Sequence, residues 1–168
     1  SLTDDEQVKF SEYFGNIERS GKKSNITKDT DRRLSTKLAD VSNIDKKSNV
    51  FKKNDPRRIF NLGNRLWHSD SSFKKIPAKY SLLSSKTIVN NGGNTEFSDM
   101  RLAYENLDYD MRKKIETLYC EHSLIYSRQR LGFDMEKELS KSGIKNFKPV
   151  LQPLVRQIKE NNRKYSDI

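Results

Sequence analysis

Two side chains that could bind a metal ion stand two positions apart in the sequence, at His68 and Asp70. We expect both at the end of a strand, where side chains two positions apart leave the same face of a sheet. A neutral imidazole and a carboxylate that point the same way suit a divalent first-row transition metal. The pair is half of a metal site, and the alternative is a histidine at a strand end beside a solvated aspartate.

The strand expected to position this pair runs from Arg58 to Asp70 and ends at the surface. The same alternation places Asn64 on the face of His68. The Asn64 amide could therefore line a pocket beside the metal, and the alternative is an amide that satisfies neighbouring backbone groups.

Capping residues and hydrophobic spacing predict three helices. Thr3 with Glu6 three positions later is a capping box that opens the first helix. Asp99 and Asp108 are candidate N-cap residues for two more. Composition and alternation predict strands at 38–44, 80–89, 95–97, 119–126 and 151–156, another starting at 165–168, a turn at 45–49, and a loop or short helix at 136–148.

The composition indicates one domain over residues 1–168 with long polar connections. Only 33% of the 168 residues are hydrophobic, whereas an average globular domain is roughly 45–50% apolar. Cys120 is the single cysteine, which excludes an intrachain disulfide and a zinc–thiolate cluster. We interpret it as a small buried apolar residue in a reducing compartment.

The sequence also predicts a cytoplasmic protein with no membrane partner. No apolar run is long enough to span a bilayer, and the start at Ser1–Glu6 lacks the basic and apolar regions of a signal peptide.

Basic residues exceed acidic ones by 33 to 23, which gives a formal net charge of +10. A positive field attracts polyanions and small anions. The lysines and arginines are scattered, however, and no basic stripe with interleaved aromatic residues is visible. We interpret them as a solvated surface, and a basic nucleic-acid-binding module is the weakest of three hypotheses.

The His-x-Asp pair lies within an ordered series of longer strings. They are WHSDSSF at 67–73, PAKYSLLS at 77–84, GGNTEFSDMRLAY at 92–104, EHS at 121–123, YSR at 126–128 and QPLVR at 152–156. Together they closely resemble the iron(II)/2-oxoglutarate-dependent dioxygenases of the taurine and 2,4-dichlorophenoxyacetate dioxygenase family. The resemblance implies an α+β, mainly β fold: an incomplete double-stranded β-helix, which is a cupin-like jelly roll, with flanking helices.

The resemblance also implies roles for matching residues. His68 and Asp70 match the first histidine and the carboxylate of the family's two-His-one-carboxylate triad, which holds Fe(II) and leaves positions for 2-oxoglutarate and O2. Thr95 matches the hydroxyl that hydrogen-bonds the distal carboxylate of 2-oxoglutarate, and Phe97 would face the same pocket. The alternative for Thr95 is an ordinary strand threonine after the Gly92–Gly93 turn.

His122 is the only other histidine and belongs to the EHS string. Three interpretations of it stay open: a third metal ligand, a substrate-pocket residue as the family position of the string implies, and a partly buried histidine with satisfied nitrogens.

The family's second metal histidine and its 2-oxoglutarate-binding arginine have no match in this sequence, so we expect the N-terminal and central part of the fold. The first hypothesis is a dioxygenase that hydroxylates a small, anionic organic substrate and releases succinate and CO2. The second is a truncated, non-catalytic remnant or fragment of that fold. Its unpaired strand edges would favour association, with a homo-oligomer as one form.

Overall fold

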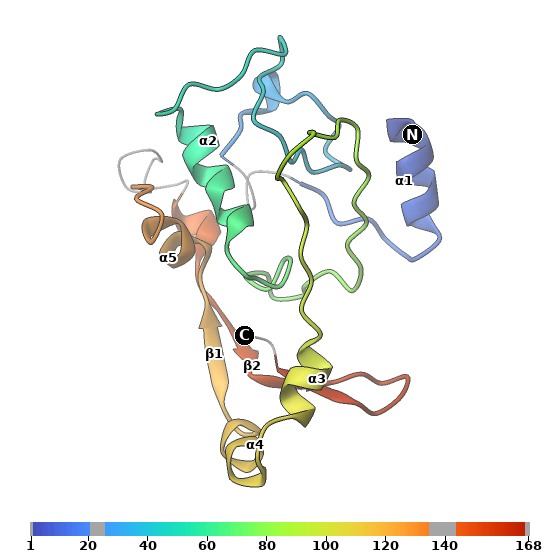
Figure 1. Cartoon of the computed structure of the whole chain (residues 1–168), viewed down its shortest axis with the longest axis vertical. Helices are drawn as coiled ribbons and strands as arrows, with labels where there is room; N and C mark the ends of the chain where they lie inside the picture. Colours follow the sequence, from blue (N-terminus) through green and yellow to red (C-terminus); the bar gives the residue numbers. More distant parts are fainter. Residues whose placement is uncertain (1, 21–25, 135–143, 167–168) are drawn as a thin grey trace. The chain divides into compact units, whose positions relative to one another are not determined.

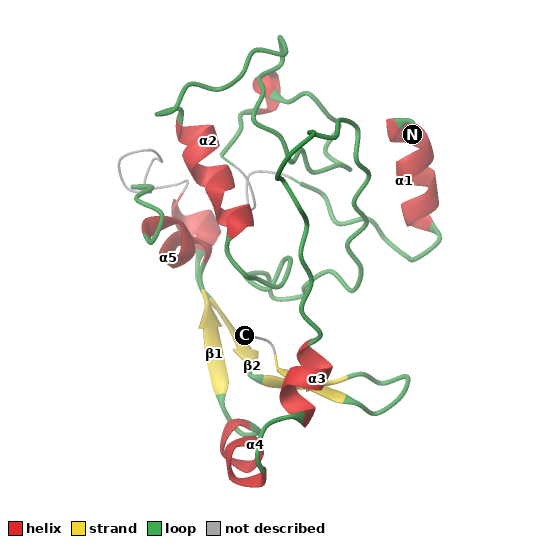
Figure 2. Cartoon of the chain, in the orientation of Figure 1, coloured by secondary structure: helices red, strands yellow, loops and turns green. Residues whose placement is uncertain are grey.

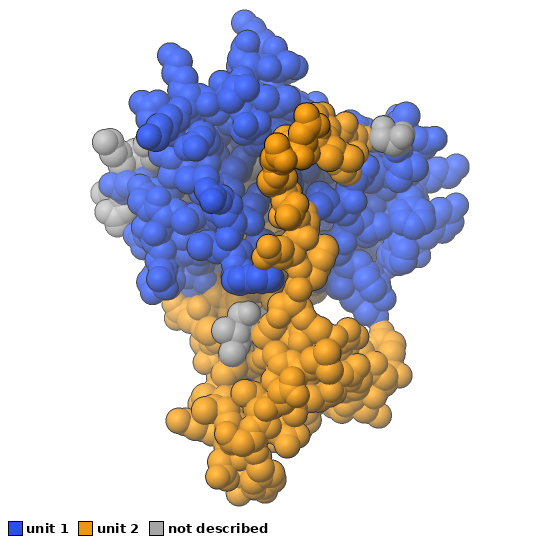
Figure 3. Space-filling view, viewed as in Figure 1, with its two compact units in different colours: residues 1–68, 78–84, 123–149 blue, residues 69–77, 85–122, 150–168 orange. Residues whose placement is uncertain are grey.

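The computed structural model of the chain describes residues 2–20, 26–134 and 144–166 (Figure 1). The described residues form helices and two small sheets joined by long loops (Figure 2). The chain divides into two compact units (Figure 3). Unit 1 comprises Ser1–His68, Ala78–Ser84 and Ser123–Pro149, and unit 2 comprises Ser69–Pro77, Ser85–His122 and Val150–Ile168.

Unit 1 is helical. Its elements are α1 (Asp4–Glu12), η1 (Asp29–Asp31), α2 (Pro56–Asn61), η2 (Leu62–Arg65), α5 (Leu124–Gln129) and η3 (Lys145–Phe147). The predicted capping box opens α1: the Thr3 hydroxyl accepts from the Glu6 N–H at 3.2 Å, and the Thr3 N–H donates to the Glu6 carboxylate at 2.8 Å. Phe14 of the turn after α1 packs against Phe10 and Tyr80, with ring centroids 5.4 and 5.5 Å away.

The strand predicted over Arg58–Asp70 is wrong, because this segment begins as a helix. The Asp55 carboxylate accepts from the Arg57 N–H at 2.9 Å, which caps α2. Pro56 occupies the first turn, where a missing N–H costs nothing and the fixed φ suits a helix. Asn64 therefore lies in η2 and does not share a strand face with His68.

The core of unit 1 forms around Phe60 of α2. The other buried hydrophobic side chains described in this unit belong to its C-terminal part, namely Leu124, Phe133 and Phe147. Phe60 and Phe133 meet edge to face at 5.6 Å, and the Arg128 guanidinium stacks 4.7 Å from the Phe60 centroid. Burial lowers the pKa of that guanidinium. A Cβ at Gly63 would lie 1.9 Å from Arg128 Nη1, so this close approach requires glycine.

The strands predicted at 38–44, 80–89 and 95–97 are not formed by the described residues. The predicted turn at 45–49 is confirmed: the Asp45 N–H donates to the Asn49 carbonyl at 2.9 Å, and one isolated bridge joins Ile44 to Val50. Strand propensity expresses how well side chains fit a pleated, half-buried surface. These segments have the composition of strands but no partner strand within the described ranges.

Unit 2 pairs helices with two antiparallel ribbons. Its elements are α3 (Met100–Glu105), α4 (Tyr109–Ile115), β1 (Tyr119–His122), β2 (Val150–Pro153), β3 (Val155–Gln157) and β4 (Lys164–Ser166). β1 pairs with β2 so that Cys120 lies opposite Gln152, and β3 pairs with β4. Asp99 and Asp108 cap α3 and α4 as predicted.

The single strand predicted at 151–156 is instead two strands of different sheets, β2 and β3, and β4 ends at Ser166, within the strand predicted to start at 165. The predicted extended run over 119–126 ends at His122. Ser123 caps α5 at that point, because its hydroxyl accepts from the Tyr126 N–H at 3.1 Å. Most of the segment predicted as loop or short helix at 136–148 lies outside the described residues; its end contains η3. The α+β composition is confirmed, although helices outnumber strands among the described residues, and the two-stranded sheets of these residues do not confirm a jelly roll.

The Glu116 carboxylate, just after α4, accepts hydrogen bonds from α3 and from β4 of unit 2. Tyr104 of α3 is 5% exposed, and its hydroxyl donates to the Glu116 carboxylate at 2.7 Å. Lys164 of β4 donates to the same oxygen at 2.5 Å. These bonds, first from Lys164 and then from Tyr104, lower the pKa of Glu116 below its ordinary 4.5.

We predict that this carboxylate makes stability depend on pH. A carboxyl with a depressed folded pKa stabilises the fold above its unfolded pKa, and the contribution is lost as the pH falls through the folded value. Glu116→Gln should therefore unfold more easily than wild type at pH 7, and the difference should shrink as the pH falls below about 4.5. Urea denaturation between pH 7 and pH 3.5 measures both effects. Lys164→Met should weaken the same pH dependence, and an unchanged pH dependence in Glu116→Gln would contradict the assignment.

Candidate metal centre

His68 follows η2 at the end of unit 1, with an exposed side chain. Its Nδ1 lies 2.5 Å from the Leu66 carbonyl oxygen. A carbonyl oxygen can only accept, so Nδ1 must carry the proton. In a neutral imidazole the lone pair is then on Nε2, and a hydrogen bond of this type to a backbone carbonyl orients the ring of metal-binding histidines. The local geometry of His68 fits a metal ligand.

Asp70 lies in a turn of unit 2 and is exposed. Ser71 has a φ of 59°, in the left-handed region that non-glycine residues rarely occupy. The Lys74 N–H donates to the Ser71 carbonyl at 2.9 Å. The turn is also bonded from β2, where the Gln152 side chain donates to the carbonyls of Ser72 and Lys74 at 3.1 and 2.8 Å.

His68 and Asp70 belong to different units, but only Ser69 separates them in the chain. Consecutive residues span at most about 3.6 Å each, so the two Cα atoms stay within about 7 Å of each other. The Gln152 bonds reach the chain just after Asp70, at the Ser72 and Lys74 carbonyls.

Within the described ranges, no group of three or more His, Cys, Asp or Glu side chains could hold a metal ion. His122, the other histidine, is half-buried on β1 of unit 2. Its Nε2 is buried and has no hydrogen-bond partner among the described residues. The interpretation of a histidine with both nitrogens satisfied is therefore wrong for Nε2 in this structure.

The other predicted site residues are exposed. Thr95 and Phe97 lie in a loop of unit 2, and the Phe97 side chain is 88% exposed. The loop follows Gly92 and Gly93, whose φ values of 74° and 72° confirm the Gly-Gly turn. Asn64 is exposed on η2 of unit 1.

Gln152 is the residue near the candidate site that the sequence analysis missed. Its sequence signal is a polar residue within the strand-like run Leu151–Arg156. Alternation places its side chain on the other face of the strand from the exposed Leu151. Only the structure shows that this amide is 4% exposed and reaches the turn after Asp70.

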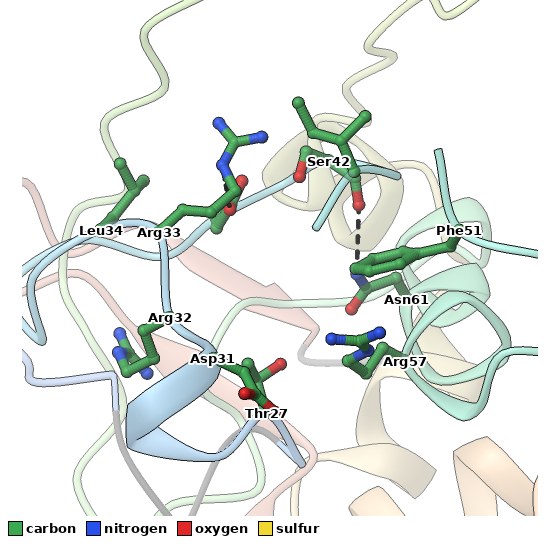
Figure 4. A pocket seen from close by; sticks show the side chains of 11 residues that line it. Thr27, Asp31, Arg32, Arg33, Leu34, Ser42, Phe51, Arg57 and Asn61 are labelled. Atoms are coloured by element: carbon green, nitrogen blue, oxygen red, sulfur yellow. Dashed lines mark hydrogen bonds and ion pairs between the residues drawn. The ribbon is translucent and has the colours of Figure 1, made fainter. Parts of the chain in front are cut away.

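A hollow in unit 1 is lined by three arginines, Arg32, Arg33 and Arg57 (Figure 4). Its lining consists of Thr27, Asp31, Arg32, Arg33, Leu34, Asp40, Ser42, Ile44, Phe51, Arg57 and Asn61. Arg33 pairs with Asp40 at 3.3 Å, and Arg57 pairs with Asp55 at 2.8 Å and lies over the Phe51 ring. The bond from Arg57 lowers the pKa of Asp55. Two of the three arginines are thus already engaged by carboxylates.

The family model for the taurine catabolism dioxygenase TauD, TfdA family matches residues 1–166 of the chain. The chain belongs to the TauD/TfdA family. This membership confirms the resemblance drawn from the ordered strings around His68 and Asp70.

Two curated relatives and one solved structure show how similar this TauD/TfdA chain is to known proteins. It is 37% identical over 164 residues to the alpha-ketoglutarate-dependent 2,4-dichlorophenoxyacetate dioxygenase of Burkholderia sp. (strain RASC), covering 98% of this chain and 54% of the relative. It is 33% identical over 167 residues to the (S)-phenoxypropionate/alpha-ketoglutarate-dioxygenase of Sphingobium herbicidovorans, covering 97% and 53%.

The crystal structure of AAD-2 in complex with Mn(II) and N-oxalylglycine superimposes with a TM-score of 0.92 at 48% identity. The match covers 99% of this chain and 56% of AAD-2. The TauD/TfdA chain thus spans about half the length of the curated relatives it matches. None of its described helices is both long and apolar enough to cross a membrane.

Proposed function

We propose that the chain is part of a non-haem Fe(II), 2-oxoglutarate-dependent dioxygenase, in which residues 1–168 form the N-terminal and central part of a jelly-roll fold. The enzyme hydroxylates a small, anionic organic substrate and releases succinate and CO2. The observation that carries this proposal is the family match over nearly the whole chain. The two named relatives support an anionic substrate, because phenoxyacetates and phenoxypropionates are carboxylates.

His68 and Asp70 hold the iron. The fixed tautomer of His68 and the exposed carboxylate of Asp70, kept close by the chain, fit that role. Bound Fe(II), together with 2-oxoglutarate and O2, supplies the oxidising power that turns a C–H bond into C–OH. The protein's own task is to present both ligands on one side of the cation, leaving its other positions open.

The Thr95 hydroxyl donates a hydrogen bond to the distal carboxylate of 2-oxoglutarate, and Phe97 forms an apolar wall of the same pocket. Asn64 and His122 contribute polar groups on the substrate side. N-Oxalylglycine, the ligand in the AAD-2 complex, is 2-oxoglutarate with an N–H in place of one methylene, which supports a 2-oxoglutarate pocket in this chain.

A second metal histidine and a 2-oxoglutarate-binding arginine come from a part of the fold that the 168 residues do not include. Two observations support this: the chain covers 54% of the Burkholderia relative, and large apolar side chains of unit 2 are exposed, among them Ile76 and Ile88 at 83% each. The alternative is a non-catalytic remnant of that fold.

The first prediction concerns iron and 2-oxoglutarate together. Anaerobic addition of both to the natural polypeptide that contains this chain should give the visible charge-transfer band of a keto acid chelated to Fe(II). His68→Ala should abolish the band, because the imidazole ligand is lost. Asn54→Ala, an exposed residue of unit 1, should keep it. A wild-type protein that folds but gives no band would favour the remnant.

A second prediction concerns Thr95. A hydrogen bond to a charged group contributes about 1.5–3 kcal/mol, so Thr95→Val should raise the half-saturating 2-oxoglutarate concentration of that band by about tenfold or more. Thr87→Val, which alters another exposed loop threonine of unit 2, is the matched control and should leave the value unchanged. Equal half-saturation for the Thr95 variant and wild type would remove Thr95 from the site.

A further inference from the structure

Gln152 is one of two buried polar residues among the described side chains, with 4% exposure, and the other is Ser166. A buried amide is tolerated only where its donors and its acceptor are hydrogen-bonded. Nε2 donates to the Ser72 and Lys74 carbonyls, and Oε1 accepts from Nη2 of Arg156. Both donors and the acceptor oxygen of this side chain are therefore in use.

The two carbonyls belong to the turn that presents Asp70. They lie two and four positions after Asp70 in the sequence. Within the same turn the Lys74 N–H donates to the Ser71 carbonyl. The other backbone bond of this turn, from the Ser72 N–H to the Ser69 carbonyl, is long at 3.5 Å. The left-handed Ser71 makes the turn costly on its own. The amide of Gln152 thus supplies the two short bonds that attach the turn to β2.

The strand β2, which carries Gln152, is itself held by backbone hydrogen bonds. It pairs with β1 over Tyr119–His122, and the Leu154 N–H continues the pairing by donating to the Leu118 carbonyl at 2.9 Å. Arg156 of β3 orients the amide by donating to its oxygen, so that the two N–H bonds point at the turn. The residues joined by these hydrogen bonds, from Arg156 through Gln152 to the turn, all belong to unit 2.

We propose that Gln152 is a positioning residue for Asp70: it holds the turn so that the carboxylate is ready to bind the metal. This inference rests on the proposed function, since it assumes that Asp70 is a ligand. Partners that orient ligands from outside the coordination sphere typically change metal affinity by about 10–100-fold when altered.

Gln152→Glu is the sharpest test because it keeps the shape of the side chain and its acceptor for Arg156. At pH 7.5 the carboxylate cannot donate, so both bonds to the turn are lost. Gln157→Glu is the matched control: Gln157 of β3 also donates its amide to a backbone carbonyl, that of Asn162 at 3.0 Å, but in a different turn. Gln152→Met removes the donors without adding charge and serves if Gln152→Glu does not fold.

Two quantities are measured on the natural polypeptide that contains this chain: hydrogen exchange of a peptide covering residues 69–75, and Mn(II) affinity by EPR of the free ion. We expect faster exchange and Mn(II) binding weakened by about tenfold in Gln152→Glu. Gln157→Glu should stay within about twofold of wild type for both quantities, since its bond serves another turn.

The outcomes separate the two proposals. If wild type binds Mn(II) and the Gln152 variants bind it equally well, the positioning role is wrong and the proposed function stands. If wild type does not bind Mn(II), both proposals fail. If Gln157→Glu weakens Mn(II) binding as much as Gln152→Glu, the effect is general destabilisation and the positioning role is again wrong.

Discussion

The turn that presents Asp70 depends on one buried amide 80 residues further along the chain, that of Gln152. A short polar turn with a left-handed serine cannot hold a carboxylate in one place by its own backbone bonds. The amide supplies two bonds to the turn and is oriented by Arg156. Because an unsatisfied buried amide is costly, the ribbon and the turn stabilise each other through this side chain.

His68 is positioned by a different device. Its proton is held on Nδ1 by the Leu66 carbonyl just before it, so its orientation is set within a few residues of the chain. One candidate ligand is thus prepared by local backbone and the other by a distant strand. Only Ser69 lies between the two in the chain, so their Cα atoms stay within about 7 Å of each other.

Local signals predicted local structure well. The capping residues Thr3, Asp99 and Asp108 each open a helix as expected, because a cap acts within one turn. The strand expected after Arg58 failed since the Asp55–Pro56 helix signal was overlooked. The strands at 80–89 and 95–97 failed because a strand also needs a partner, which composition does not specify. The family was recognised from ordered strings, whereas the bonds of Gln152 are tertiary contacts that no local pattern contains.

The central claim is that His68 and Asp70 bind one metal ion. A crystal structure of the natural polypeptide containing this chain, grown without oxygen in the presence of Mn(II) and measured at the manganese absorption edge, tests it most directly. The account predicts an anomalous peak within bonding distance of both His68 Nε2 and an Asp70 carboxylate oxygen. A peak bound elsewhere, or one that contacts His68 through Nδ1, would contradict it.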